Sequence, residues 1–539
     1  MDKLKQAVLA AIPLLVIAIL GPAIGFRRAS AAGEPPPGPD RFTVIDQEYT
    51  RYEWWLTAWA DNQVACTLEI DHAGLPLGGE VYSICGKALY DRWMATRPCT
   101  QSETDPASCT GYYLVLAGSE AAVRQVPVAL PEAVVWVTLD GCAPYNSTFR
   151  CDALPTLVLT GEEPLSGEYI LSLAGRLDGS DFTCDPLCQV DLAPTGQDGL
   201  RLEFWATSSY GDTSRLFEAH VRVIGSDDPA DPTWYVDVLT DRWRGDPLAG
   251  CSQEWHSFPP VGGVPAWLST PQRAEELVSN VTYEYLSARL LRQGIADGAA
   301  CPDGGLTPDG QASPCGLEAA RPAVVAWQNR FDGLIFDAAR ATGVPAQLLK
   351  NLFGRESQFW PGVTPGRPEA GLGQLTGNGA DTALLWNRPF FEQFCPGVLD
   401  DALCRRGYPH LSLSQQEELR RALVDSVDAF CADCPLGLDL VRAEDSIAIF
   451  AETLLANCAQ AGALVGNTYN LAPGEKASYE DLWRLTLVNY NAGPGCLTLA
   501  LQETKRVGEA LNWANLASHL TPACRGALDY VEQITRLLP

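Results

Sequence analysis

One glutamate of this sequence stands at the end of a helix that is otherwise predicted to be buried. The stretch NLFGRESQFW spans Asn351–Trp360, and the helix begins earlier, where Pro345 occupies a first helical position that suits proline. Apolar residues recur at three- and four-residue spacing, which predicts one buried face made of Leu348, Leu349, Leu352 and Phe353. The next positions on that face are Glu356 and Ser357.

A carboxyl group in this position is suited to general acid catalysis. Arg355 is adjacent in sequence, and adjacent helix positions do not face each other, so Glu356 is expected to have no close cation. Because burial disfavours the charged form, the pKa of Glu356 is predicted to lie above its reference value. A carboxyl that stays protonated near neutral pH can donate a proton to a leaving group. This stretch alone leaves one alternative open, a helix-end glutamate turned to solvent beyond Gly354.

The composition of the chain excludes several classes of function. The chain has 539 residues, of which 46% are hydrophobic and 19% charged, so several folded domains are expected. The net charge of −28 argues against nucleic acid or anionic lipid as the main partner. The 5 histidines form no HExxH pair, and no glycine-rich phosphate loop opens a helix. We therefore expect neither a metal nor a cofactor.

The cysteines indicate an oxidising compartment. There are 18 cysteines, an even number, and only 2 methionines, which predicts a set of disulfides in an exported protein. The pattern CxxC occurs once, at Cys431–Cys434, so zinc binding is disfavoured. At that position a structural pair is favoured over a redox pair.

The N-terminal residues agree with export. Residues 1–32 combine a basic start, an apolar run over Ala7–Phe26 and small residues that resemble a cleavage site. The run is also long enough to span a bilayer, so a signal peptide and a membrane anchor both stay open. Residues 33–40, GEPPPGPD, predict a stiff linker. The rest of the chain is expected to be extracellular or in the cell envelope, either secreted or held by the N-terminal segment.

The chain up to about Pro260 has the pattern of β structure. Short alternating runs lie between turns rich in Gly, Pro and Asp, and similar stretches begin at Thr67 and Thr156. This faint repeat predicts two tandem immunoglobulin-like β-sandwiches, over residues 41–152 and 153–260. Three tryptophans of the motif YEWWLTAW are predicted to be core, with a sugar-binding surface as the alternative: Trp54, Trp55 and Trp59.

The remainder of the chain has the pattern of helices. Residues 261–328 combine helical sequence with a Gly/Pro-rich loop, in which Cys301 and Cys315 are expected to form a local clasp. Residues 329–539 are predicted to be mainly α. The expected architecture is therefore two β-sandwiches, a helix with a disulfide-clasped linker, and a helical domain.

Three further stretches carry polar residues that belong with the glutamate. The loop PEAGLGQLTGNGADTA contains Gln374 among glycines. The apolar helix LWRLTLVNYNAGPG ends on Tyr490 and Asn491 at a Gly-Pro stop signal. The C-terminal stretch GALDYVEQITRLL contains Tyr530.

Together these stretches resemble the catalytic domain of the soluble lytic transglycosylases, in the lysozyme-like superfamily. That family has a helix ending Glu-Ser, a Gly-Leu-Met-Gln loop, a Tyr-Asn-Ala-Gly segment and a late Tyr-Val, in this order. The matching positions are Glu356-Ser357, Gly371-Leu372-Gly373-Gln374, Tyr490-Asn491-Ala492-Gly493 and Tyr530-Val531. The resemblance covers about residues 331–538. It departs at Gly373, where the family has Met, and over 383–442, a much longer segment with four cysteines that is expected to lie beside the cleft.

The resemblance implies a substrate and a reaction. The substrate is the glycan strand of peptidoglycan, cut between N-acetylmuramic acid and N-acetylglucosamine without net addition of water. Glu356 would protonate the glycosidic oxygen and then take the proton of the muramyl 6-hydroxyl, which closes a 1,6-anhydro ring. The substrate's own acetamido group can stabilise the cation, so the reaction requires no second carboxylate. Five residues would orient the sugar and the glutamate: Ser357, Gln374, Tyr490, Asn491 and Tyr530.

Two other functions remain open at this stage. The first is a lysozyme-like hydrolase of peptidoglycan, which needs a second carboxylate to activate water. In an inverting enzyme that carboxylate lies about 6.5–9.5 Å from the acid, and Glu369 and Asp381 are the candidates in the sequence. The second is a non-catalytic adhesion or binding protein of the envelope, in which the sandwiches would bind the partner.

Overall fold

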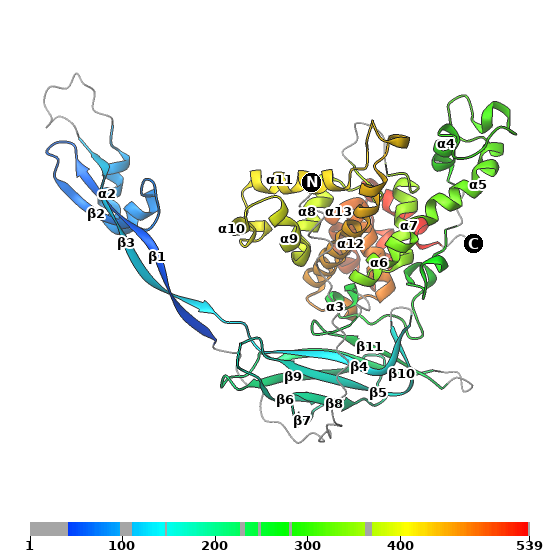
Figure 1. Ribbon diagram of the computed structural model, residues 1–539, viewed down its shortest axis with the longest axis horizontal. Helices are drawn as coiled ribbons and strands as arrows, with labels where there is room; N and C mark the ends of the chain where they lie inside the picture. The colour runs from blue at the N-terminus through cyan, green and yellow to red at the C-terminus, as the bar shows by residue number, and fades with distance from the viewer. Residues whose placement is uncertain are drawn as a thin grey trace. The chain divides into compact units, whose positions relative to one another are not determined.

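The computed structural model describes residues 41–97, 110–145, 148–226, 232–245, 250–279, 283–361 and 369–536. The predicted signal peptide or anchor and the predicted linker, residues 1–32 and 33–40, lie outside these ranges. The described chain is a sheet-rich, antiparallel region followed by a helical region, as the sequence predicts (Figure 1). It divides into two compact units. One is Gly38–Glu132 with Glu163–Glu168, and the other contains the eight-stranded sheet and all the later helices.

The smaller unit is a three-stranded antiparallel sheet with one helix. Its elements are β1 (Phe42–Ala58), β2 (Val64–Ile70), α2 (Gly78–Met94) and β3 (Tyr112–Ala129), with the strand order β2-β1-β3. β1 pairs with β3 along its whole length, whereas β2 pairs only with the last third of β1. The other part of β1 and β3 is therefore a two-stranded ribbon.

One face of the small sheet packs against α2. The buried side chains of this core are Trp54, Leu56, Leu68, Ile70, Val81 and Tyr112. Trp54 is thus a core residue, as expected, whereas Trp55 and Trp59 are exposed. A sandwich requires two facing sheets, and the described residues of this unit supply one. The predicted sandwich over residues 41–152 is not confirmed.

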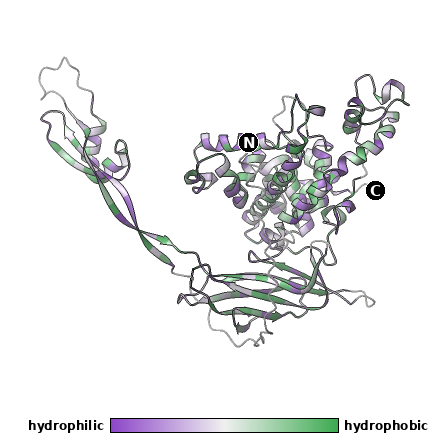
Figure 2. Ribbon diagram, in the orientation of Figure 1, coloured by the Kyte–Doolittle hydropathy of each residue, from purple (hydrophilic) through white to green (hydrophobic). Residues whose placement is uncertain are grey.

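The larger unit begins with an eight-stranded antiparallel sheet in the order β4-β5-β11-β10-β9-β6-β7, with β8 beside β5. Its strands are β4 (Val134–Tyr145), β5 (Thr148–Glu162), β6 (Ile170–Leu177), β7 (Ser180–Cys184), β8 (Leu187–Asp191), β9 (Leu200–Ser208), β10 (Phe217–Gly225) and β11 (Trp234–Leu239). Buried and partly exposed residues alternate along β5 from Pro155 to Thr160, and the strands of the sheet carry both hydrophobic and hydrophilic residues (Figure 2). β4 also contacts β9, so the sheet folds over a single core.

The described residues of the helical region form thirteen α-helices joined by loops and short 3₁₀ turns. They are α3 (Gly250–Trp255), α4 (Glu284–Arg292), α5 (Pro314–Asn329), α6 (Asp332–Thr342), α7 (Ala346–Ser357), α8 (Gly377–Trp386), α9 (Arg388–Phe394), α10 (Asp401–Cys404), α11 (Leu413–Val427), α12 (Leu440–Tyr469), α13 (Tyr479–Val507), α14 (Trp513–Ser518) and α15 (Gly526–Thr535).

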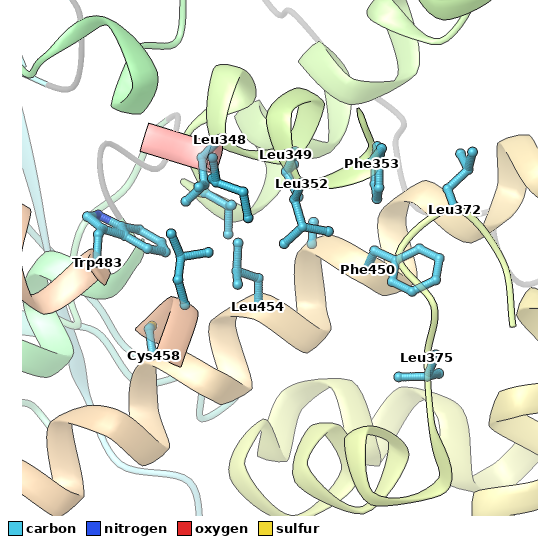
Figure 3. Packing of buried hydrophobic residues seen from close by; sticks show 14 of the residues in the cluster. Leu348, Leu349, Leu352, Phe353, Leu372, Leu375, Phe450, Leu454, Cys458 and Trp483 are labelled. Carbon is cyan, nitrogen blue, oxygen red and sulfur yellow. The ribbon is translucent and has the colours of Figure 1, made fainter. Parts of the chain in front are cut away.

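The predicted apolar face of α7 is the centre of the helical core. Its four members are at most 1% exposed, and they lie opposite side chains of α12 and α13 (Figure 3). The opposing residues are Phe450, Leu454, Cys458 and Trp483. Burial of this face orients α7 on the core and places Glu356, one turn after Leu352, at the edge of that core.

Within the described residues, α12 is the one helix long and apolar enough to cross a membrane by length and composition. Its buried residues belong to the helical core, among them Ile447, Phe450, Leu454 and Val465. A long core helix of a soluble protein meets the same criteria of length and apolar composition as a membrane-spanning helix. The packing of α12 accounts for its composition without a membrane.

The helical core includes residues that precede position 261. Cys251 forms a disulfide with Cys458 of α12, and the buried indole of Trp255 donates a hydrogen bond to the Cys458 carbonyl at 2.9 Å. The same indole packs against Trp483, with 5.2 Å between ring centroids. The short helix α3 is therefore an integral part of the helical core.

The described cysteines form eight disulfides. They include the predicted clasp Cys301–Cys315, and the pair Cys431–Cys434 is also closed. The others are Cys66–Cys85, Cys142–Cys151, Cys184–Cys188, Cys251–Cys458, Cys395–Cys404 and Cys496–Cys524. Two of the eight, Cys395–Cys404 and Cys431–Cys434, lie in the segment 383–442, as expected for a pinned excursion. So many disulfides are consistent with an oxidising, extracellular or envelope environment.

Candidate functional site

Glu356 lies in the last turn of α7, where the helix leaves the core. The helix ends at Gln358, which adopts the left-handed conformation (φ 49°) and whose N–H bonds to the Phe353 carbonyl. Pro345, predicted to be the first helical residue, is instead the N-cap of α7, and the helix begins one position later at Ala346. Glu356 itself is half-buried, one turn after Leu352, so its carboxyl is at the edge of the apolar core.

The nearest partner of this carboxyl comes from the other end of the helical region. The hydroxyl of Tyr530, in α15, donates a hydrogen bond to Oε1 of Glu356. Burial raises the pKa of Glu356 to about 7, and the charge of Glu369 adds to the rise, while the Tyr530 hydrogen bond and the charge of Arg355 oppose it. No ion pair joins Glu356 to a cation among the described residues. The exposed guanidinium of Arg355 instead lies over the Tyr530 ring, 5.9 Å from its centroid.

A second tyrosine ties α13 to the glycine-rich loop. Tyr490 donates a hydrogen bond to the carbonyl of Gly373 at 2.5 Å. Burial raises the pKa of Tyr490 well above its usual value, and the negative charge of Glu356 raises it further. Three residues later Gly493 (φ 82°) interrupts the helix, so the predicted stop is an internal break in α13. Tyr490 therefore stands at the end of the first half of α13, facing the loop and the carboxyl.

The loop that carries Gln374 is held in a tight turn. Ala370 and Leu375 pair through two backbone hydrogen bonds of 3.0 and 2.8 Å. Between them, Gly371 and Gln374 both have positive φ, and the Gln374 side-chain amide donates to the Gly371 carbonyl at 2.7 Å. In this conformation the amide of Gln374 stabilises its own loop.

The departure at Gly373 has a structural cause in α12. A Cβ atom at Gly373 would lie 2.4 Å from the ring of Phe450, which is too close for any side chain. Phe450 is buried and packs against Phe353 of α7, with 5.7 Å between ring centroids. The phenylalanine therefore fills the space beside the loop, and this role was not identified from the sequence.

Two other predicted site residues are Ser357 and Asn491. Ser357 is buried, and its hydroxyl donates to the Phe353 carbonyl of its own helix at 3.2 Å. Asn491 is exposed, next to Tyr490. The structure thus brings together Glu356, Tyr530 and Tyr490 with the loop of Gln374, while Ser357 is bonded to its helix.

The two candidate second carboxylates have different surroundings. Asp381 accepts hydrogen bonds from Tyr408 and from Nε of Arg420, the latter at 2.9 Å, so it is engaged in an ion pair between α8 and α11. It lies inside α8, whose N-cap is Thr376. Glu369 is half-buried and close enough for its charge to raise the pKa of Glu356.

A buried lysine on α7 was also missed in the sequence. Lys350 is 0% exposed, and its ammonium contacts Asp332 of α6 at 2.8 Å, the side chain of Asn329 at 2.9 Å and the Leu277 carbonyl at 3.1 Å. These contacts anchor the side of α7 away from its apolar face. The periodicity of α7 marks only the apolar face, so the sequence has no signal for this second anchor.

The described residues contain no cluster of three or more His, Cys, Asp or Glu side chains that could hold a metal ion. Comparison with models of protein families, with curated proteins and with solved structures finds no match to this chain.

Proposed function

We propose that this chain is an exported peptidoglycan lytic transglycosylase in which Glu356 is the general acid and base. The observation that carries the proposal is the Glu356 carboxyl itself, half-buried, with a pKa raised to about 7 and bonded to a buried tyrosine. A carboxyl of this kind is protonated in a large fraction of molecules at neutral pH, which is what proton donation to a glycosidic oxygen requires.

The reaction uses Glu356 twice. Its proton passes to the glycosidic oxygen as the bond to C1 of the muramyl residue breaks, and the acetamido group of the substrate supports the cation at C1. The resulting carboxylate then accepts the proton of the muramyl 6-hydroxyl as that oxygen bonds to C1. Tyr530 donates to the carboxylate in the interval, because its hydrogen bond stabilises the charged form. One bond breaks, one forms, and Glu356 regains its proton without water.

The neighbouring groups support this assignment by position. Tyr490 and Gln374 belong to a hydrogen-bonded unit that borders the carboxyl, and Asn491 is exposed beside it. In the proposal these side chains orient the sugar, whereas Ser357 acts through its bond to α7. The helical region would then be the lysozyme-like domain of residues 329–539.

The remaining parts of the proposal concern location. The N-terminal segment would export the chain, as a signal peptide or as a membrane anchor. The β region, residues 41–260, predicted as immunoglobulin-like sandwiches, would hold the helical region at the wall. The partner is the peptidoglycan glycan strand, and the net charge of −28 gives no reason to expect nucleic acid.

A peptidoglycan hydrolase is the second candidate, and Glu369 favours it. This carboxylate is close enough for its charge to raise the pKa of Glu356, and an inverting hydrolase needs a second carboxylate near the acid to activate water. Asp381 is a weaker candidate because it is paired with Arg420. The two enzymes differ in product, since only hydrolysis leaves a reducing sugar end.

The proposal is tested by Glu356→Gln, which keeps the size of the side chain and removes the proton. Loss of general acid catalysis should lower wall cleavage by at least about 10²–10⁴-fold. The matched control is Glu418→Gln, the same substitution at an exposed position of α11, which should leave cleavage unchanged. A Glu356→Gln variant that melts like the wild type and still cleaves the wall would contradict the proposal.

A further inference from the structure

One aromatic side chain of the helical region is turned to solvent. Among the Phe, Tyr and Trp residues that the structure describes between positions 250 and 536, Phe430 alone is exposed, at 52%. Its neighbours Val427 and Ala429 are fully buried. The segment is therefore packed at its base, and the ring of Phe430 points outward from it.

The segment that carries Phe430 is held rigidly. From here on, the clasp means residues 428–439, between α11 and α12, and not the segment closed by Cys301–Cys315. It is closed by the disulfide Cys431–Cys434 and by the bridge between Phe430 and Leu438. Its hydrogen bonds include Cys431 N to Gly437 O (3.1 Å), Asp439 N to Ala429 O (2.8 Å) and Arg442 Nη1 to Asp428 O (3.0 Å). An exposed apolar ring on a preformed segment loses little conformational freedom when a ligand packs on it.

The base of the clasp abuts the glycine-rich loop of the candidate site. A Cβ atom at Gly371 would lie 2.7 Å from the Val427 carbonyl, so the two backbones are in close contact. The Gly371 carbonyl accepts the side-chain amide of Gln374, and the Gly373 carbonyl accepts the hydroxyl of Tyr490. The glycine-rich loop therefore lies between the clasp on one side and the site of Glu356 and Tyr490 on the other.

We propose that the clasp forms one wall of the glycan-binding cleft and that a saccharide ring of the substrate packs on Phe430. This proposal rests on the proposed function and adds a substrate contact to it. Flat aromatic rings bury a large apolar area at low entropic cost, and binding sites combine such rings with a few polar groups. Here the polar groups are those of the adjoining loop, and Phe430 supplies the apolar surface for the C–H face of a sugar.

The test uses the full chain and soluble oligosaccharides of the wall glycan. Phe430→Ala should raise KM by about tenfold, equivalent to about 1.4 kcal/mol, and leave kcat within about twofold. Phe430→Tyr, which keeps the ring, should have the KM of the wild type. Phe430→Leu keeps apolar bulk for folding but lacks the ring, so its KM should also rise. Leu413→Ala, at an 85% exposed position of α11, is the matched control and should change neither constant.

The outcomes separate this inference from the proposed function. A wild-type chain that does not cleave glycan overturns the proposed function and, with it, the contact at Phe430. If the wild type cleaves but Phe430→Ala and Phe430→Leu both keep its KM, the proposed function stands and the clasp proposal is wrong. Calorimetric binding of the same oligosaccharides to Glu356→Gln, with and without Phe430→Ala, should show the same tenfold difference in Kd. Equal affinities would also overturn the clasp proposal.

Discussion

The hydroxyl of Tyr530 donates a hydrogen bond to the carboxyl of Glu356 across a sequence separation of 174 residues. The tyrosine is 3% exposed, and the two side chains come from α15 and α7, which pack against each other. The bond favours the ionised carboxylate, whereas burial favours the protonated form and has the larger effect. Burial outweighs the hydrogen bond, and the pKa of Glu356 is raised to about 7.

The first prediction concerns the pH dependence of cleavage. Because Glu356 must be protonated, kcat/KM should fall as the pH rises through about 7. Tyr530→Phe keeps the buried ring and removes the donor that stabilises the carboxylate, so the pKa of Glu356 should rise. The falling limb of the pH profile should then move to higher pH. A limb that stays in place or moves to lower pH would show that Tyr530 does not act on Glu356 in this way.

The second prediction concerns stability. In the unfolded chain Glu356 titrates near its ordinary value of 4.5, and in the folded chain near 7. Between these values the unfolded state loses a proton that the folded state keeps, so the wild type loses stability as the pH rises through this window. Glu356→Gln has no proton to lose. Its free energy of unfolding relative to the wild type should therefore increase between pH 4.5 and 7, by up to about 3 kcal/mol.

Denaturant unfolding of both proteins at several pH values measures this difference. Glu418→Gln is again the control, because an exposed glutamate should not produce the same pH dependence. A difference between Glu356→Gln and the wild type that is constant over the window would show that the Glu356 pKa is not raised in the folded chain.

The third prediction concerns the boundary of the helical region. A chain of residues 250–539 keeps the Cys251–Cys458 disulfide and the buried Trp255, whereas a chain of residues 270–539 loses both. Loss of a buried tryptophan costs about 3–5 kcal/mol and loss of a disulfide about 2–4 kcal/mol. The longer chain should melt cooperatively and keep its turnover on soluble glycan, and the shorter one should melt at a much lower temperature. Equal melting temperatures would mean that α3 is not part of the helical core.

The sequence predicts the helical part of this fold better than the β part. The apolar face of α7 is visible from local periodicity, and the Gly-Pro signal after Tyr490 marks a break inside α13 rather than the predicted end of the helix. The faint repeat was misleading, because its two copies have different structures. The motif PLGGE leads into α2, where Glu80 bonds to the Leu77 N–H, whereas PLSGE leads into β6, which pairs with β9. Pairing with distant strands decides between the two, and the short motif does not contain that information.

The site shows the same limit. Glu356 was found from the sequence because the helix period places it on the buried face. The sequence shows a glycine at position 373 but not what fills the space beside it, since Phe450 lies in a helix that begins 67 residues later in the chain. The buried Lys350 looks like an ordinary surface lysine of a helix until its partner Asp332 is located. Contacts between separate elements supply these parts of the site.

The product of wall digestion tests the central claim most directly. If Glu356 works alone, the muramyl 6-hydroxyl is the nucleophile, and the fragments end in 1,6-anhydro rings, lighter by one water than hydrolysis products. Glu369→Gln should then leave the nature of the product unchanged, because Glu369 activates no water. Mass spectrometry of fragments from purified wall, before and after borohydride reduction, distinguishes the two results. We predict anhydro ends that do not react with borohydride, whereas reducible ends as the main product would contradict the transglycosylase assignment and favour the hydrolase.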